Sequence, residues 1–299
     1  MTRGRVFLAT MFGVVFSAAG TSAGRQDRPA LSPPKPPEAK LAAVLEKARD
    51  YCLRLDRAAL DFVCREQVDE EINQASRPSI SGAIPPVPGQ FNGGRLIQPA
   101  RVDDFRKTRL VYDYQYRRKG GEVKERRDLM EKNGDKVAKT DVEPETRHFK
   151  FRDILFGASG LLGAGASLRY EYRVAGEDKV RGEAVVRIDC MSLPALAGRQ
   201  LAGRATVRVK DGAVLRIDWD PRSFGGWQEV QSVADLFGMK PQVESYTEYA
   251  IEKSGVRFPS YDYTEEAYSG GGKVTFVRST TTVKYIDYKF FTVETIIEN

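Results

Sequence analysis

The feature that most constrains this chain is a two-residue alternation of apolar and charged side chains. Tyr170, Tyr172 and Val174 alternate with charged residues in a segment that begins at Leu168, and the same alternation recurs over residues 110–117, 184–190, 201–210 and 213–220. Successive side chains of a β-strand point to opposite faces, so each segment predicts a strand with one apolar and one solvated face. Turn sequences typical of hairpins include Asn133-Gly134, Asp211-Gly212 and Ser254-Gly255.

Roughly ten long strands of this kind do not form a flat sheet, because strands twist and the apolar face needs cover. The predicted fold is mainly β: an open antiparallel half-barrel of roughly ten or more strands, with an N-terminal helix and a short lid segment packed on the concave face. A two-sheet sandwich is the common alternative. The long strands joined by hairpins favour the half-barrel.

The N-terminal helix is expected over residues 38–59, where apolar residues recur at three- and four-residue steps. Its stripe toward the sheet is predicted to comprise Leu45, Ala48, Cys52, Leu55 and Ala59. The first strand follows at residues 62–72, with Glu66 and Glu70 on its apolar side. Weaker helical patterns lie at residues 155–162 and 228–237, and the glycine-rich segment 157–165 is the candidate lid.

The first 23 residues have the layout of a secretory signal peptide: a basic start, an uncharged apolar run and small residues up to Ala23. The apolar run is about 14 residues, shorter than the roughly 20 that span a membrane; an uncleaved anchor is the alternative. We expect cleavage near Ala23 and a periplasmic or secreted protein. A Pro-rich linker (24–37) then precedes a single domain (38–299) with a Pro/Gly-rich insertion at 77–99.

Several functional classes are disfavoured by the residues present. His148 is the single histidine, so the sequence predicts no zinc site, and the chain has no G-x-S-x-G nucleophile turn. The glycines of segment 157–165 fit neither a dinucleotide nor a phosphate loop. No cofactor is expected, and a net charge of +6 without a basic–aromatic module predicts no nucleic-acid partner. The basic stretch 101–127 is either a solvated sheet face or an attractant for phosphate and anionic lipid.

Three cysteines in an exported protein predict one disulfide and one leftover thiol. The helix is expected to end between Cys52 and Cys64, so that the following strand folds back beneath it. Cys52–Cys64 is therefore the predicted bond, with Cys190 as a buried apolar side chain. Cys64–Cys190 is the rival pairing.

A resemblance to a known family rests on the strand–turn–strand segment Ala205–Trp219, with its Asp-Gly turn, and on the C-terminal segments 272–278 and 285–295. With the helix that feeds a strand and the long basic and aromatic hairpins, the chain resembles the periplasmic lipoprotein-carrier (lipoprotein-sorting) superfamily, and within it secreted members, over about residues 40–299. The resemblance implies an incomplete barrel with a helical lid over a hydrophobic cavity that accepts acyl chains.

The expected function is therefore a non-enzymatic binding protein that carries a lipid or a lipoprotein acyl chain, in peripheral contact with the envelope membrane or lipoproteins. The residues expected to line the cavity and its mouth are Tyr112, Tyr114, Tyr170, Tyr172, Leu161 and Leu162. A cell-envelope interaction module with a filled core is the alternative. A hydrolase is third, with Glu66 and Glu70 as its best carboxylates; adjacent pairs such as Asp103-Asp104 and Glu265-Glu266 point to opposite faces of a strand.

Overall fold

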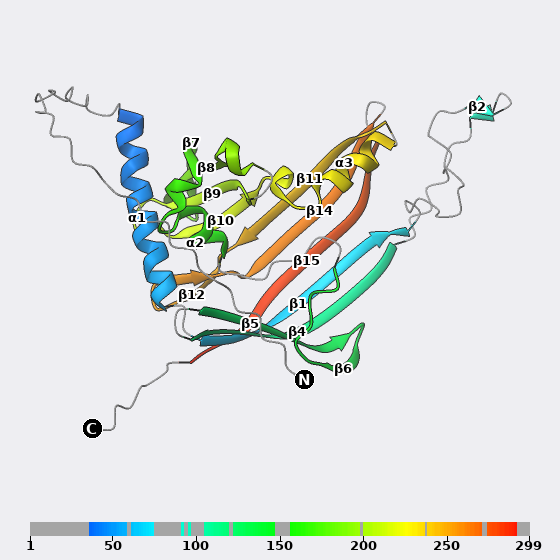
Figure 1. The fold of residues 1–299 in the computed structure, drawn as a ribbon, viewed down its shortest axis with the longest axis horizontal. Helices are drawn as coiled ribbons and strands as arrows, with labels where there is room; N and C mark the ends of the chain where they lie inside the picture. Colours follow the sequence, from blue (N-terminus) through cyan, green and yellow to red (C-terminus); the bar gives the residue numbers. More distant parts are fainter. Residues whose placement is uncertain are drawn as a thin grey trace, which may run out of the picture. The chain divides into compact units, whose positions relative to one another are not determined.

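The computed structural model (Figure 1) describes residues 36–58, 61–74, 91–92, 95–96, 105–119, 122–146, 156–197, 200–236, 238–270 and 274–291. The predicted signal peptide, most of the linker, His148 and nearly all of the insertion at 77–99 lie outside these residues. Two short strands inside that insertion, β2 (Phe91–Asn92) and β3 (Arg95–Leu96), pair with each other.

The described fold is mainly β, as predicted, and its centre is one antiparallel sheet of eleven strands. The strand order is β6-β5-β4-β1-β15-β14-β11-β10-β9-β8-β7. Because β6 and β7 have a neighbour on one side only, the sheet is open and does not close into a barrel. The strands are β1 (Asp61–Asn73), β4 (Phe105–Lys119), β5 (Glu122–Lys132), β6 (Asp135–Lys139), β7 (Tyr170–Val180), β8 (Glu183–Ser192), β9 (Gly203–Arg208), β10 (Val214–Trp219), β11 (Lys240–Glu248), β14 (Tyr261–Gly270) and β15 (Val274–Phe291).

The predicted hairpin turns are confirmed where the structure describes them. Asn133 and Gly134 both have positive φ, 55° and 91°, as the tight turn between β5 and β6 requires. Gly212, with φ 76°, joins β9 to β10, and a Cβ there would lie 2.3 Å from the backbone of Lys47. A glycine therefore lets this turn approach the N-terminal helix. Ser254-Gly255 joins two short strands, β12 (Ile251–Lys253) and β13 (Val256–Phe258).

The predicted N-terminal helix is α1 (Pro36–Ala58), two residues longer at its start than expected. The predicted stripe is largely confirmed: Ala48, Cys52 and Leu55 are fully buried, and Leu45 packs against the same core. Ala59 lies outside the described residues. Lys47 Nζ donates a 3.0 Å hydrogen bond to the Val209 carbonyl, which fixes the helix to the strand end near the Gly212 turn.

Two further helices lie where the weaker patterns predicted them. The first, α2 (Phe156–Leu162), packs on α1 and is followed by a 3-10 turn, η2 (Ala166–Leu168). The second, α3 (Trp227–Leu236), packs on β11, with Val230 and Ala234 buried against Tyr268. None of the helices in the described part of the chain is long and apolar enough to cross a membrane.

One strand boundary differs from the prediction. Leu168 was expected on the apolar side of a strand, but it lies in η2 and is 78% exposed. The reason is local: Gly165 adopts φ 75°, and its carbonyl accepts a hydrogen bond from the Leu168 N–H at 3.1 Å. This turn delays the strand until Tyr170, where the predicted alternation begins.

Candidate functional site

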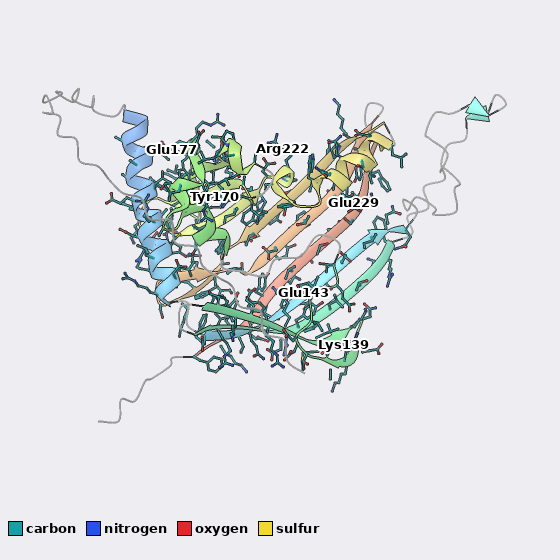
Figure 2. All side chains as sticks on the ribbon, viewed as in Figure 1. Lys139, Glu143, Tyr170, Glu177, Arg222 and Glu229 are labelled. Carbon is teal, nitrogen blue, oxygen red and sulfur yellow. The ribbon has the colours of Figure 1, made fainter. Side chains whose placement is uncertain are left out.

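The inner face of the sheet, defined here as the face that bears Phe62, Tyr112 and Ile188, carries an apolar region. The four predicted tyrosines all belong to one hydrophobic cluster that also contains buried residues of α1 and α2. Tyr112 and Tyr114 are fully buried on β4, and Tyr170 is 2% exposed on β7, where Figure 2 labels it. Tyr172 is partly buried against the same cluster.

The hydroxyl of each of these four predicted tyrosines has a hydrogen-bond partner. Tyr170 and Tyr172 donate to the carbonyls of Leu201 (2.7 Å) and Leu161 (2.8 Å). Tyr114 bonds to the Glu125 carboxylate, and the Tyr112 hydroxyl accepts from the Glu145 N–H at 3.4 Å. Burial raises the pKa of all four phenols, that of Tyr112 to about 12, so they are neutral at physiological pH.

The lid candidate α2 is seated on this apolar region. Leu161 and Leu162 are buried, and the Ser159 hydroxyl donates to Asp56 of α1 at 2.8 Å. A Cβ on Gly157 would lie 2.2 Å from the Tyr249 hydroxyl, so only glycine permits this approach. The structure thus brings Leu161 to Tyr172, whereas Tyr112 and Tyr114 lie eight strands away in the sheet order, on β4.

The predicted disulfide is not formed: Cys52, Cys64 and Cys190 are all free and buried. The Cys52 thiol faces α2, with its sulfur 3.5 Å from the Ala158 carbonyl oxygen. Cys64 lies on β1 opposite Tyr114, beside the Tyr288 hydroxyl. The strand does fold back after the helix, but it presents Cys64 to other strands. Burial raises the pKa of all three thiols, so they remain protonated.

A polar region occupies the inner face along β1, β15 and β14. Its first part is a buried ion pair, in which Arg127 donates to both carboxylate oxygens of Glu66, at 2.7 and 3.3 Å. The Tyr285 hydroxyl donates to Asp262 at 2.8 Å, close to this pair. Burial raises the pKa of Glu66, which Arg127 opposes, and raises the pKa of Asp262 to about 6.

The second part of the polar region surrounds Glu266. This fully buried carboxylate accepts hydrogen bonds from Tyr268 and from Ser279, the latter at 3.3 Å, and lies 3.6 Å from Arg278 Nη1. On β1, Glu70 accepts from the Thr281 hydroxyl at 3.3 Å. Glu265 points away and binds Tyr263, as the strand geometry of the adjacent pair predicted.

The polar region was only partly foreseen. The parity of the first strand correctly identified Glu66 and Glu70 as inner residues, whereas Asp103-Asp104 lies outside the described residues. Sequence reasoning missed Arg127, Asp262 and Arg278. Arg127 shares the parity of buried Leu129 on β5, and this was the available signal.

The contacts of Glu66 favour a structural role for this carboxylate over a catalytic one. One guanidinium engages both oxygens of Glu66, so this group is held in an ion pair rather than poised for proton transfer. Within the described ranges, no three His, Cys, Asp or Glu side chains gather closely enough to hold a metal ion.

We consider three pockets on the described surface, and none of these three is lined by the six residues predicted to bind ligand. The largest of these three, about 720 Å³, has Asp189 in its wall. Burial alone would raise the pKa of Asp189, but hydrogen bonds from Arg204 (2.6 Å) and Arg173 (2.9 Å) lower it. A pocket of about 560 Å³ follows β5 near Arg126 and Glu143. The third, about 400 Å³, opens on the polar region between Glu70 and Arg278.

Comparison with known proteins finds no matching protein family and no matching curated protein. Solved structures similar to this chain include a LolA superfamily protein from Nitrosomonas europaea (8% identity, 85% of this chain and 94% of that chain, TM-score 0.34). A DUF1329 family protein from Desulfovibrio piger has 10% identity over 84% and 95%, with a TM-score of 0.38. An outer membrane lipoprotein-sorting protein domain from Vibrio parahaemolyticus has 10% identity over 84% and 93%, with a TM-score of 0.36. The first and third of these proteins bear names of the superfamily that the sequence resembles.

Proposed function

We propose that the protein is a non-enzymatic binding protein that holds the acyl chain of a lipid or lipoprotein between α2 and the tyrosine-bearing strands. The observation that supports the proposal is the packing of α2 against the apolar region. This helix has seven residues, and a helix this short has little stability of its own. Its place therefore depends on its neighbours, and a competing apolar chain can displace it.

The energetics set a minimum length for such a chain. Displacing α2 exposes Leu161 and Leu162, at a cost of roughly 1.5–3 kcal/mol for each side chain. An incoming chain gains about 0.8 kcal/mol for each buried methylene. About ten methylenes gain roughly 8 kcal/mol, of which roughly 2–5 kcal/mol remains after the cost of displacing α2. We expect saturable binding in the micromolar range for chains of about 14 or more carbons and none for short chains.

A tethered variant tests the proposal. Asp56 and Ser159 are hydrogen-bonded at 2.8 Å, so cysteines at these two positions, in a Cys52→Ala background, can lock α2 onto α1. Fluorescent fatty-acid titration of the reduced variant should match the wild-type protein, while the oxidised variant should lose at least tenfold in affinity. The reduced form is the matched control. Absence of saturable binding by the wild-type protein, or equal binding by the locked form, would contradict the proposal.

The second candidate is a cell-envelope interaction module with a filled core. It is favoured by the burial of the tyrosines and by the hydrogen bonds of their hydroxyls. This candidate predicts that no lipid is carried through purification, which native mass spectrometry measures. Both candidates place the protein in the periplasm or outside the cell. N-terminal sequencing of the exported protein tests cleavage near Ala23.

A further inference from the structure

Arg278 owes its position to a β-bulge in β15. Ser279 pairs with Glu266, but the next pair is Val277 with Ala267, so Arg278 is an extra residue between them. As a result, Arg278 and Ser279 are both buried although they are neighbours in sequence. Bulges redirect side chains in this way and are over-represented beside functional sites.

The Arg278 guanidinium is buried beside Tyr268 and Glu266. Its side chain is 9% exposed, and among the described residues its Nη1 atom is buried without a hydrogen-bond acceptor. The nearest carboxylate oxygen recorded for it belongs to Glu266, at 3.6 Å. Arg127, by contrast, donates two hydrogen bonds to Glu66. Because buried guanidinium donors normally find acceptors, the under-used donor indicates a ligand.

This guanidinium lies in the wall of the 400 Å³ pocket, which we term the Arg278 pocket. Its wall carries three positive and three negative side chains. Lys132 and Glu145 form an ion pair at 2.7 Å. Glu229, which Figure 2 labels, belongs to α3 and also lines the pocket. The complete wall comprises Glu70, Ile72, Asn73, Arg106, Thr108, Lys132, Glu145, Thr146, Glu229 and Arg278.

The balance of charge in the pocket wall restricts the chemical class of ligand that can bind. A dianion at Arg278 would also approach Glu70 and Glu266, and like charges in a buried site are costly. A ligand with one negative and one positive group leaves the pocket neutral. Arg278 can offer its planar donor fork to an oxyanion, the geometry in which arginine binds best. Glu70 and Glu229 can accept hydrogen bonds from an ammonium group.

We infer that the Arg278 pocket binds a zwitterion with an oxyanion at one end and an ammonium group at the other. A phosphodiester of ethanolamine has this chemistry, as free glycerophosphoethanolamine or as the headgroup of a phospholipid. Binding here does not require α2 to move, because neither Leu161 nor Leu162 lines the pocket. The inference can therefore be tested independently of the acyl-chain proposal.

Isothermal titration calorimetry with glycerophosphoethanolamine tests the inference directly. We expect saturable binding of one equivalent, and at least tenfold weaker binding of glycerol phosphate and of ethanolamine. No saturable binding in the millimolar range would overturn the inference, as would glycerol phosphate binding as tightly as the zwitterion.

Variants locate the binding. Arg278→Met alone leaves Glu266 buried without its ion-pair partner, so the Glu266→Gln/Arg278→Met double variant removes both charges together. We expect it to lose affinity at least tenfold. Glu70→Gln, which keeps the side-chain shape, should lose the preference for the zwitterion over glycerol phosphate. Arg204→Met, in the pocket around Asp189, is the control and should bind as wild type. Unchanged binding by the double variant would overturn the inference.

Vesicles distinguish the two sources of the ligand. The protein is sedimented with phosphatidylglycerol vesicles that contain or lack phosphatidylethanolamine. Cosedimentation that needs phosphatidylethanolamine and is lost in the double variant identifies a lipid headgroup. Binding of glycerophosphoethanolamine without such cosedimentation identifies a free zwitterion. Both results support the shared chemistry.

Discussion

Replacement of Arg127 by methionine should destabilise the fold severely. The side chains of Glu66 and Arg127 are 0% and 5% exposed, and the guanidinium also lies 4.7 Å from the ring centroid of Tyr114. Methionine fills much of the volume but leaves the Glu66 carboxylate buried without a counter-charge. Removing one partner of a buried ion pair costs about 3–5 kcal/mol. That is a large part of the 5–15 kcal/mol that typically stabilises a domain.

The measurement is urea denaturation followed by far-UV circular dichroism. The Glu66→Gln/Arg127→Met double variant removes both charges and should recover most of the lost free energy of unfolding. If the pair instead contributes little, Arg127→Met will cost less than about 1 kcal/mol, as exposed pairs do. That result would refute the reasoning that the ion pair between Glu66 and Arg127 is shielded from water.

The pH dependence adds a second criterion. Burial raises the pKa of Glu66 in the folded state, and Arg127 lowers it. A carboxyl group whose pKa is higher in the folded state than in the unfolded state destabilises the fold when it is ionised. The free energy of unfolding therefore falls as pH rises from the pKa of the unfolded state through that of the folded state. Loss of Arg127 raises the folded pKa further. The difference in stability between wild type and Arg127→Met should therefore be smaller at pH 4.5 than at pH 7.5; a constant difference would contradict the assigned cause.

Three other substitutions follow from the same structure. Burial raises the pKa of Asp262 to about 6, so the stability that Asp262 contributes should fall as pH rises from about 4 through 6. Asp262→Asn should reduce this fall by roughly 1–3 kcal/mol, measured by urea denaturation at each pH. A pH profile identical to that of the wild type would contradict this prediction. Leu55→Asp places a charge on the fully buried side of α1 and should cost several kcal/mol; an unchanged melting temperature would put the helix in solvent. Gly157→Ala should cost about 1–3 kcal/mol by overpacking against Tyr249, whereas the control Gly225→Ala, with open space at its Cβ, should stay within about 0.5 kcal/mol.

The elements of this fold were largely predictable from sequence because burial on one face leaves a periodic trace. The strand predicted over residues 184–190 is part of β8, and Ile188 and Cys190 are buried as expected, whereas Ala184 at the start of the strand is exposed. The stripe of α1 was readable for the same reason, at helical period. Turn chemistry added the hairpin boundary at Asn133-Gly134, where both residues need positive φ.

Pairing between distant segments was less predictable. β1 lies between β4 and β15, and its register with β15 joins residues more than 200 positions apart, such as Glu66 with Tyr285. Alternation gives the inner side of each strand but carries no information about its neighbour. For this reason the sequence identified Glu66 as an inner carboxylate and did not identify its partner, Arg127, which reaches it from β5 across the intervening β4.

The alternation that predicts the strands assigns Arg278, the central residue of the Arg278 pocket, to the wrong face of the sheet. Counted from the inner residues Tyr285, Val283 and Thr281 of β15, alternation assigns Ser279 to the inner face and Arg278 to the outer face. One extra residue at the bulge reverses the parity, and Arg278 is buried on the inner side. A single inserted residue has no periodic trace of its own in one sequence. Departures from local rules concentrate where a chain positions a side chain for a purpose other than packing, and an arginine buried by a bulge, with donors still available in a charged pocket, is such a departure.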